Sequence, residues 1–265
     1  MSQREKLTTS TGMAKLDALL PVVFGLAGIF SIGEGGAMAL RTAVVIDYEN
    51  VHRMARGTFD PQGDLREYLI HPMQFARAAI RERNDRQREG YPHAELSKVL
   101  VFRGRPSAQH EPTYYTRNTS QATQWRADGA VVTLRELKYT YQYDEHGRVV
   151  TDEAGRKLLA SGSKPQEKGI DVLCALECVR QAQRDDIDLV VLASRDTDLV
   201  PVLDQLHDAH HDRPSLSAKV ETVAWFDRDA LRQGGSLQPT RPRKIWNTNL
   251  GRRQLEASID RNDYR

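Results

Sequence analysis

The chain contains little cysteine: Cys174 and Cys178 are the only two among 265 residues. They lie four residues apart in an apolar stretch with helical character, so their side chains point the same way. A disulfide across one helical turn has poor geometry, and two cysteines cannot build a disulfide framework or a cysteine zinc site. We interpret both as small core residues, which agrees with a reducing, cytoplasmic location.

The sequence also lacks a strong imbalance of charge. Its formal net charge is +2, although 28% of its residues are charged. These values permit a nucleic-acid partner but do not demand one. A chain of 265 residues with a hydrophobic fraction of 39% suffices for one large α/β domain with appendages, and is marginal for two domains.

The segment 1–40 lacks a complete membrane span. Its apolar run contains Pro21 and ends at Glu34, which is short of the roughly 20 residues that a spanning helix needs. A secretory signal with its small residues at 37–39 is an alternative. We favour an N-terminal extension outside the core and expect no membrane association. The glycine-rich residues 33–36 lack the full spacing of a dinucleotide loop, so no small-molecule cofactor is expected.

From Arg41 onward, short apolar runs alternate with stretches of helical spacing. Buried strands are predicted at 42–46, 98–102, 130–134, 189–193 and 220–226. Helices are predicted at 72–83, 120–127, 169–184 and 198–207, the third of them buried around its circumference. This alternation predicts an α/β, Rossmann-like three-layer fold, in which a mostly parallel sheet of about five strands has helices on both faces.

We place the folded domain at residues 41–232. Residues 138–163 interrupt its pattern, because they are rich in tyrosine and then contain a turn near Gly147, which predicts a hairpin-like insertion. From residue 233 the chain is rich in glycine, proline and arginine. We expect this basic C-terminal tail, 233–265, to be peripheral.

Acidic residues stand where the predicted elements meet. Asp47 ends the first strand, Asp171 opens the helix at 169–184, and Asp196 and Asp198 follow the fourth strand. The carboxyl ends of parallel strands form one crevice where the strand order reverses. Converging carboxylates repel one another unless a cation neutralises them, and oxygen ligands favour Mg²⁺ or Mn²⁺. Such a site suits hydrolysis of phosphodiesters, although Asp198 could also simply cap a helix.

Three segments together resemble the motifs of a known nuclease family. VVIDYENV (44–51), EKGIDVLCALE (167–177) and SRDTDLVPVL (194–203) occur in the order of the motifs of the NYN family, a branch of the PIN-like ribonucleases. The resemblance spans roughly residues 42–230. Leu199 stands where the family commonly has Phe, and Glu177 where an Asp is frequent.

The resemblance implies a PIN-like fold, an RNA substrate and a Mg²⁺ or Mn²⁺ site. The implied metal-binding and catalytic residues are Asp47, Asp171, Asp196 and Asp198. The expected substrate-binding residues are Asn50, Lys168, Ser194 and Arg103. Glu49 is expected outside the site, because it points away from Asp47 if the strand continues.

The hypothesis from the sequence is therefore a cytoplasmic, divalent-metal-dependent endoribonuclease acting on single-stranded or structured RNA. Arginines at 77–88 could add a basic surface for the RNA, or could form an ordinary solvated face. One alternative is an RNA-binding or protein-interaction module on the same fold with little or no nuclease activity. Another is a DNA nuclease or phosphatase that uses the same metal site. The sequence predicts no oligomeric state.

Overall fold

The central sheet is parallel throughout. The structure, a computed structural model, describes residues 38–229 and 235–264, so the predictions for residues 1–37 lie outside the described residues. Within them six strands form one sheet in the order β3-β2-β1-β4-β5-β6. The strands are β1 (Leu40–Asp47), β2 (Ala94–Arg105), β3 (Val131–Glu136), β4 (Leu189–Ala193), β5 (Lys219–Trp225) and β6 (Asn247–Leu250). All five predicted strands are present, and the order reverses at β1, which lies between β2 and β4.

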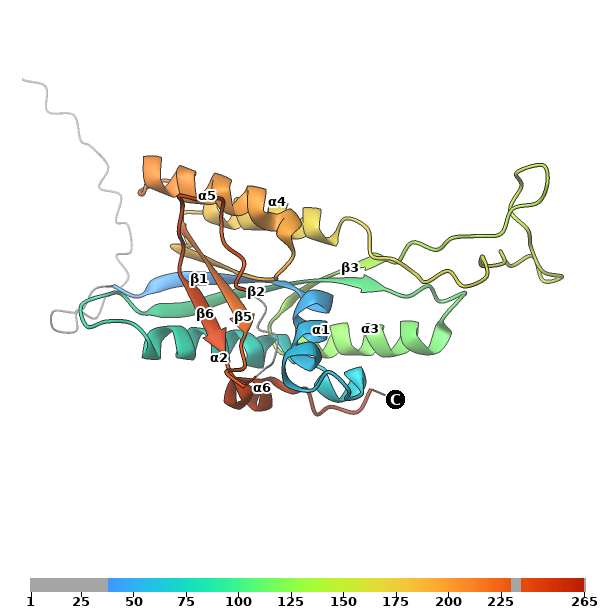
Figure 1. The fold of residues 1–265 in the computed structure, drawn as a ribbon, viewed down its shortest axis with the longest axis horizontal. Coiled ribbons are helices and arrows are strands. Elements are labelled where there is room, and N and C mark those ends of the chain that lie inside the picture. Colours follow the sequence, from blue (N-terminus) through green and yellow to red (C-terminus); the bar gives the residue numbers. More distant parts are fainter. Residues whose placement is uncertain (1–37, 230–234, 265) are drawn as a thin grey trace, which may run out of the picture. The chain divides into compact units, whose positions relative to one another are not determined.

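Helices cover both faces of the sheet, which confirms the predicted three-layer α/β fold of Rossmann-like type (Figure 1). On one face lie α1 (Tyr48–Phe59), α2 (Pro72–Asp85), α3 (Pro112–Ala127) and α6 (Arg252–Ser258). On the other lie α4 (Ile170–Ala182) and α5 (Val200–Asp212). Two short 3-10 helices, η1 (Leu65–Tyr68) and η2 (Thr197–Leu199), connect these elements.

Alternation along β1 explains why the core has two halves. Val44 and Ile46 pack under α1 and α2, whereas Ala43 and Val45 face α4 and α5, and all four are buried. A strand with both faces covered needs apolar side chains on each face. This explains the continuous apolar run of β1 at the start of the domain.

Helix α4 is buried on one side only. Cys174 and Cys178 are fully buried and free, which confirms their interpretation as core residues. Val172 and Leu176, however, are 53% and 62% exposed, so the prediction of a helix buried all round is wrong. Its apolar residues include an outer stripe that the sheet does not cover. No helix within residues 38–229 and 235–264 has the length and apolar character required to cross a membrane.

The C-terminal segment contributes to the sheet, contrary to the expected peripheral tail. Residues 247–250 pair with β5 in parallel, with Thr222 opposite Asn247 and Trp225 opposite Leu250. Helix α6 then packs against α2. The sequence gives little sign of this strand, because a four-residue edge strand with the sequence NTNL has no β-branched apolar run. Leu250 and Leu255 enter the core after folding brings β5 to them.

One arginine of the 77–88 group is not available to a ligand. Arg83 is 3% exposed and donates to both carboxylate oxygens of Glu221 on β5, at 2.9 and 3.0 Å. It also donates to the carbonyl of Pro92. A buried charge requires such a partner, so Arg83 is a structural residue that joins α2 to β5.

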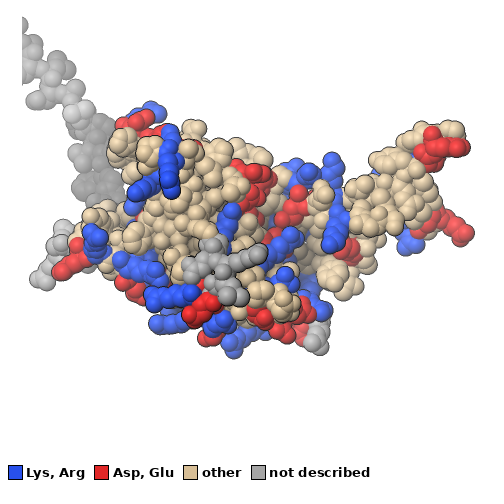
Figure 2. Space-filling model, viewed as in Figure 1, with Lys and Arg blue, Asp and Glu red and all other residues tan. Residues whose placement is uncertain are grey.

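The predicted insertion does form hairpins. Antiparallel bridges join Tyr143 to Val149 and Thr151 to Lys157, and a bridge between Lys138 and Gln166 closes its base. The two turns repeat one design, in which an aspartate oxygen accepts from backbone N–H groups two and four residues later. The following glycines have φ angles of 74° and 75°, which favour glycine. Figure 2 shows acidic side chains at both far ends of the insertion.

Candidate active site

Five of the predicted site residues line one cleft at the carboxyl edge of the sheet. This aspartate cleft has a volume of about 300 Å³. Its lining residues are Asp47, Glu167, Lys168, Gly169, Ile170, Asp171, Asp196 and Asp198. The four aspartates come from the end of β1, the first turn of α4 and the loop after β4. The crevice lies where the strand order reverses, which is the place that the topology of a parallel sheet predicts for a ligand site.

Asp47 is the most buried carboxylate of the cleft, at 6% exposure. Burial raises the pKa of Asp47 to about 6, and the charge of Asp196 adds to the effect. A hydrogen bond from Ser194 Oγ to Asp47 Oδ2, at 2.9 Å, opposes the shift. Burial therefore makes the ionised form of Asp47 unfavourable, and a cation beside the carboxylate would stabilise that form.

The loop after β4 is ordered by its own polar groups. Ser194 Oγ accepts a hydrogen bond from the backbone N–H of Asp196 at 3.0 Å. Asp196 Oδ1 in turn accepts from the N–H of Asp198 at 3.0 Å and caps η2, so the capping role expected of Asp198 belongs to Asp196. Ser194 is only 2% exposed. It therefore lies on the interior side of Asp47 and of the Asp196 backbone, and not at the surface of the cleft where a substrate-binding residue is predicted.

The start of α4 forms the opposite wall of the cleft. Gly169 adopts φ 72° and ψ 23°, the left-handed conformation, and precedes the first residue of the helix. Glycine is favoured there because it has no Cβ, which explains the Lys-Gly-x-Asp pattern. Lys168 is exposed at the cleft, and the free N–H groups of the first turn lie beside it. A helix N-terminus with a nearby lysine is suited to bind phosphate.

Glu167 also lines the cleft, as an acidic residue that is not among the predicted site residues. Burial, followed by the charge of Glu49, raises the pKa of Glu167 to about 7. Its Oε1 accepts a hydrogen bond from the backbone N–H of Gly104 at the end of β2. The signal in the sequence was its position directly before Lys168, inside the motif at 167–177.

The remaining two predicted residues lie next to the cleft. Asn50 Oδ1 accepts from the backbone N–H of Arg195 at 2.9 Å and so ties α1 to the loop after β4. Arg103, 8% exposed, donates from Nε to Glu49 Oε1 at 3.0 Å and from Nη1 to Gln121 at 2.6 Å. Glu49 receives Arg103 because β1 ends at Asp47 and helix α1 begins at the next residue, so strand alternation does not apply.

The charges of the cleft favour a bound cation. Five acidic side chains and a single ammonium group line it, and even with Glu167 partly neutral, because its pKa is about 7, the negative charge exceeds the positive. All the side-chain oxygens are hard ligands of the kind that Mg²⁺ and Mn²⁺ prefer. Within the described residues, no three acidic, histidine or cysteine side chains are grouped closely enough to enclose a metal ion. Mg²⁺ commonly keeps several waters and takes only one or two carboxylates, a smaller demand on the protein than three enclosing side chains.

Comparisons with protein-family models, with curated proteins and with solved structures found no match to this chain. The interpretation of the cleft therefore depends on its geometry and on the residues that form it.

Proposed function

We propose that this chain is a divalent-metal-dependent endoribonuclease of the NYN type, which hydrolyses phosphodiester bonds of RNA in the aspartate cleft. One observation carries the proposal: Asp47, Asp171, Asp196 and Asp198, from three separate parts of the chain, line one cleft together with Lys168. The buried free cysteines agree with a cytoplasmic location.

The acidic residues would hold the cation, and the basic groups would hold the substrate. Asp47, Asp171 and Asp196 are the proposed ligands, directly or through water. When bound, a divalent ion would bind phosphate oxygens and stabilise the negative charge that develops at phosphorus. Lys168 and the N–H groups at the start of α4 would orient the scissile phosphate.

Asp198 is suited to orient the attacking water or to hold a second ion, because it is exposed at the rim of the cleft. Its carboxylate would take a proton from the water as the water oxygen bonds to phosphorus, while the bond to the leaving ribose oxygen breaks and that oxygen takes a proton from solvent. Ser194 would hold the Asp47 carboxylate and the backbone of Asp196 in place during this step.

The test is cleavage of a labelled single-stranded RNA with Mn²⁺ or Mg²⁺, with EDTA, and by the Asp196→Asn variant. We expect cutting by the wild-type chain only when the metal is present, and loss of cutting in the variant. Cutting that survives both controls would contradict catalysis at this cleft. A wild-type chain that binds but does not cut several RNAs would instead be a binding module. A matched 2′-deoxy substrate distinguishes a ribonuclease from a DNA nuclease.

A further inference from the structure

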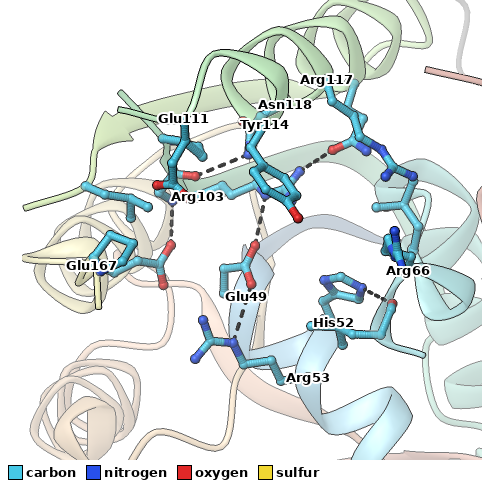
Figure 3. Close-up of a pocket in the computed structure, with 17 residues that line it drawn as sticks. Glu49, His52, Arg53, Arg66, Arg103, Glu111, Tyr114, Arg117, Asn118 and Glu167 are labelled. Carbon is cyan, nitrogen blue, oxygen red and sulfur yellow. Dashed lines mark hydrogen bonds and ion pairs between the residues drawn. The ribbon is translucent and has the colours of Figure 1, made fainter. Parts of the chain in front are cut away.

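A second cavity lies beside the aspartate cleft and shares Glu167 with it. Its volume is about 300 Å³. It is enclosed by α1, η1, the end of β2, α3 and the residues just before α4, as Figure 3 shows. A nucleotide chain whose phosphate lies in the aspartate cleft could therefore place a neighbouring group in this second cavity.

The walls of the second cavity suit a flat ring. Leu65, Leu69 and Leu137 supply apolar surface, and Tyr114 stands on α3 with 57% exposure. Bases stack readily on such surfaces, and an exposed tyrosine beside a cavity is a common stacking group.

The inner surface of this cavity has an excess of hydrogen-bond acceptors. The carboxylates of Glu49, Glu111 and Glu167 line it. Arg103 donates to Glu49, which also pairs with Arg53, as Figure 3 shows, and Arg103 donates further to Gln121. Glu111 Oε2 already accepts from Tyr139 and Glu167 Oε1 from Gly104, so one oxygen of each carboxylate remains, within the described part of the chain, to receive a donor from a ligand.

Two residues that line the cavity each carry a buried acceptor without a partner among the described residues. These acceptors are Oδ1 of Asn118 and Nδ1 of His52, and each residue is 6% exposed. His52 Nε2 lies 2.9 Å from the carbonyl oxygen of Leu65, which can only accept, so Nε2 carries the proton. Burial lowers the pKa of His52, so the ring is neutral and Nδ1 has a free lone pair. Buried acceptors without donors are uncommon in folded proteins.

The rim of the cavity is cationic. Arg53, Arg66 and Arg117 all contribute to the lining. Arg117 forms no hydrogen bond or ion pair with another residue in the described part of the chain, whereas Arg66 pairs with Asp64 at 2.7 Å. Arg117 is therefore placed to bind a backbone phosphate that follows the base into the cavity.

We propose that the second cavity binds the base of an RNA nucleotide next to the scissile phosphate and selects guanine. This inference rests on the proposed function. Guanine presents two adjacent donors, its ring N1–H and its exocyclic amino group, which a carboxylate or several acceptors can receive. Uracil presents a single N–H between two carbonyl oxygens, and these would face carboxylates. Adenine and cytosine each offer one amino group beside a ring acceptor.

The first test measures binding without catalysis. In EDTA, guanosine 5′-monophosphate should bind the full chain about tenfold more tightly than uridine 5′-monophosphate, measured by calorimetry. Asn118→Leu removes an acceptor at similar volume, and Tyr114→Ala removes the exposed ring, so both should weaken the guanine nucleotide by about tenfold. Ser120→Ala, an exposed change on the same helix, is the matched control and should bind normally. Equal affinity for the two nucleotides, or binding unchanged in both variants, overturns the inference.

The second test separates the inference from the proposed function. Mapping of cleavage sites in a mixed-sequence RNA should show cuts beside guanine for the wild-type chain and a weaker preference for Tyr114→Ala, whose exposed position makes misfolding improbable as a cause. Cutting without a base preference contradicts the guanine site and leaves the nuclease proposal standing. Guanine-nucleotide binding without any cutting supports the site and contradicts the nuclease.

Discussion

Ser194 Oγ donates a hydrogen bond to Asp47 Oδ2 at 2.9 Å, and so joins the ends of two neighbouring strands that are 147 residues apart in the chain. The same oxygen accepts from the N–H of Asp196. One buried hydroxyl therefore ties the Asp47 carboxylate to the backbone of the loop that carries Asp196.

Replacement of this hydroxyl should impair the cleft more than the fold. In Ser194→Ala, Asp47 loses a donor and the Asp196 N–H loses an acceptor, which costs about 1–3 kcal/mol of stability. We expect cleavage to fall by about tenfold, because the Asp47 carboxylate and the loop that carries Asp196 lose the group that joins them. Urea unfolding and single-turnover cleavage measure the two effects. Ser163→Ala, which removes a hydroxyl bonded to Ala160 in the insertion, is the control, and an equal loss there would contradict a role specific to Ser194.

The raised pKa of Asp47 predicts how stability depends on pH. Folding raises this pKa from 3.8 to about 6, so the folded chain binds the proton more tightly than the unfolded chain between these values. The contribution of Asp47 to stability therefore decreases as the pH rises through this window. Asp47→Asn, which has no such titration, should be more stable than the wild type at about pH 8, by up to about 3 kcal/mol.

The measurement for Asp47 is urea unfolding at several pH values in EDTA. The difference in unfolding free energy between wild type and variant should shrink towards about pH 4, because the folded wild type then carries a neutral Asp47, as the variant carries a neutral asparagine there. If the difference in stability between the wild type and Asp47→Asn stays constant as the pH changes, burial of the Asp47 charge is not the cause of that difference. Added Mg²⁺ should stabilise the wild type more than the variant, because binding to the folded state alone raises its stability.

Two acids on the same helix should behave differently. Asp171 lines the aspartate cleft, whereas Glu177, six residues later, binds Arg180 and accepts from Gln181. Asp171→Asn should reduce RNA cleavage by about a hundredfold or more, since it removes a proposed ligand. Glu177→Gln should keep most of the activity, and the cost in stability should be about 1 kcal/mol or less, because its partner Arg180 is 60% exposed and the glutamine oxygen can still accept from it. Similar losses in the two variants would mean that the whole helix, rather than the cleft, is sensitive.

The insertion should be removable without loss of the fold. The backbone N–H of Gln142 donates to the carbonyl of Leu158 at 2.9 Å, so the ends of the segment 143–157 lie side by side. Replacing that segment with Gly-Asn-Gly should leave cooperative thermal unfolding almost unchanged, because its turns are stabilised by local hydrogen bonds. Circular dichroism during heating is the measurement. A broad or strongly lowered transition would show that the hairpins support the core.

The sequence predicted the parts of the structure that depend on local pattern. The continuous apolar strands and the alternating helices define a parallel α/β sheet, and this places the residues after β1 and β4 at one edge. The convergence of Asp47, Asp171 and Asp196 follows from that topology. Buried strands and positions before helices carry strong local signals, so these elements could be predicted without coordinates.

Other features were decided by contacts between distant parts of the chain. Strand β6 exists because β5 offers an edge to a segment without strand character of its own. Arg83 is buried only because Glu221, 138 residues away, receives it. Glu49 lines the second cavity because β1 ends at Asp47 and helix α1 begins at the next residue. The unpartnered acceptors of His52 and Asn118 are brought to this cavity by the packing of α1 and α3. Periodicity shows which face of an element is apolar, whereas the partner that covers it, and the polar groups left unpaired, are set by tertiary packing.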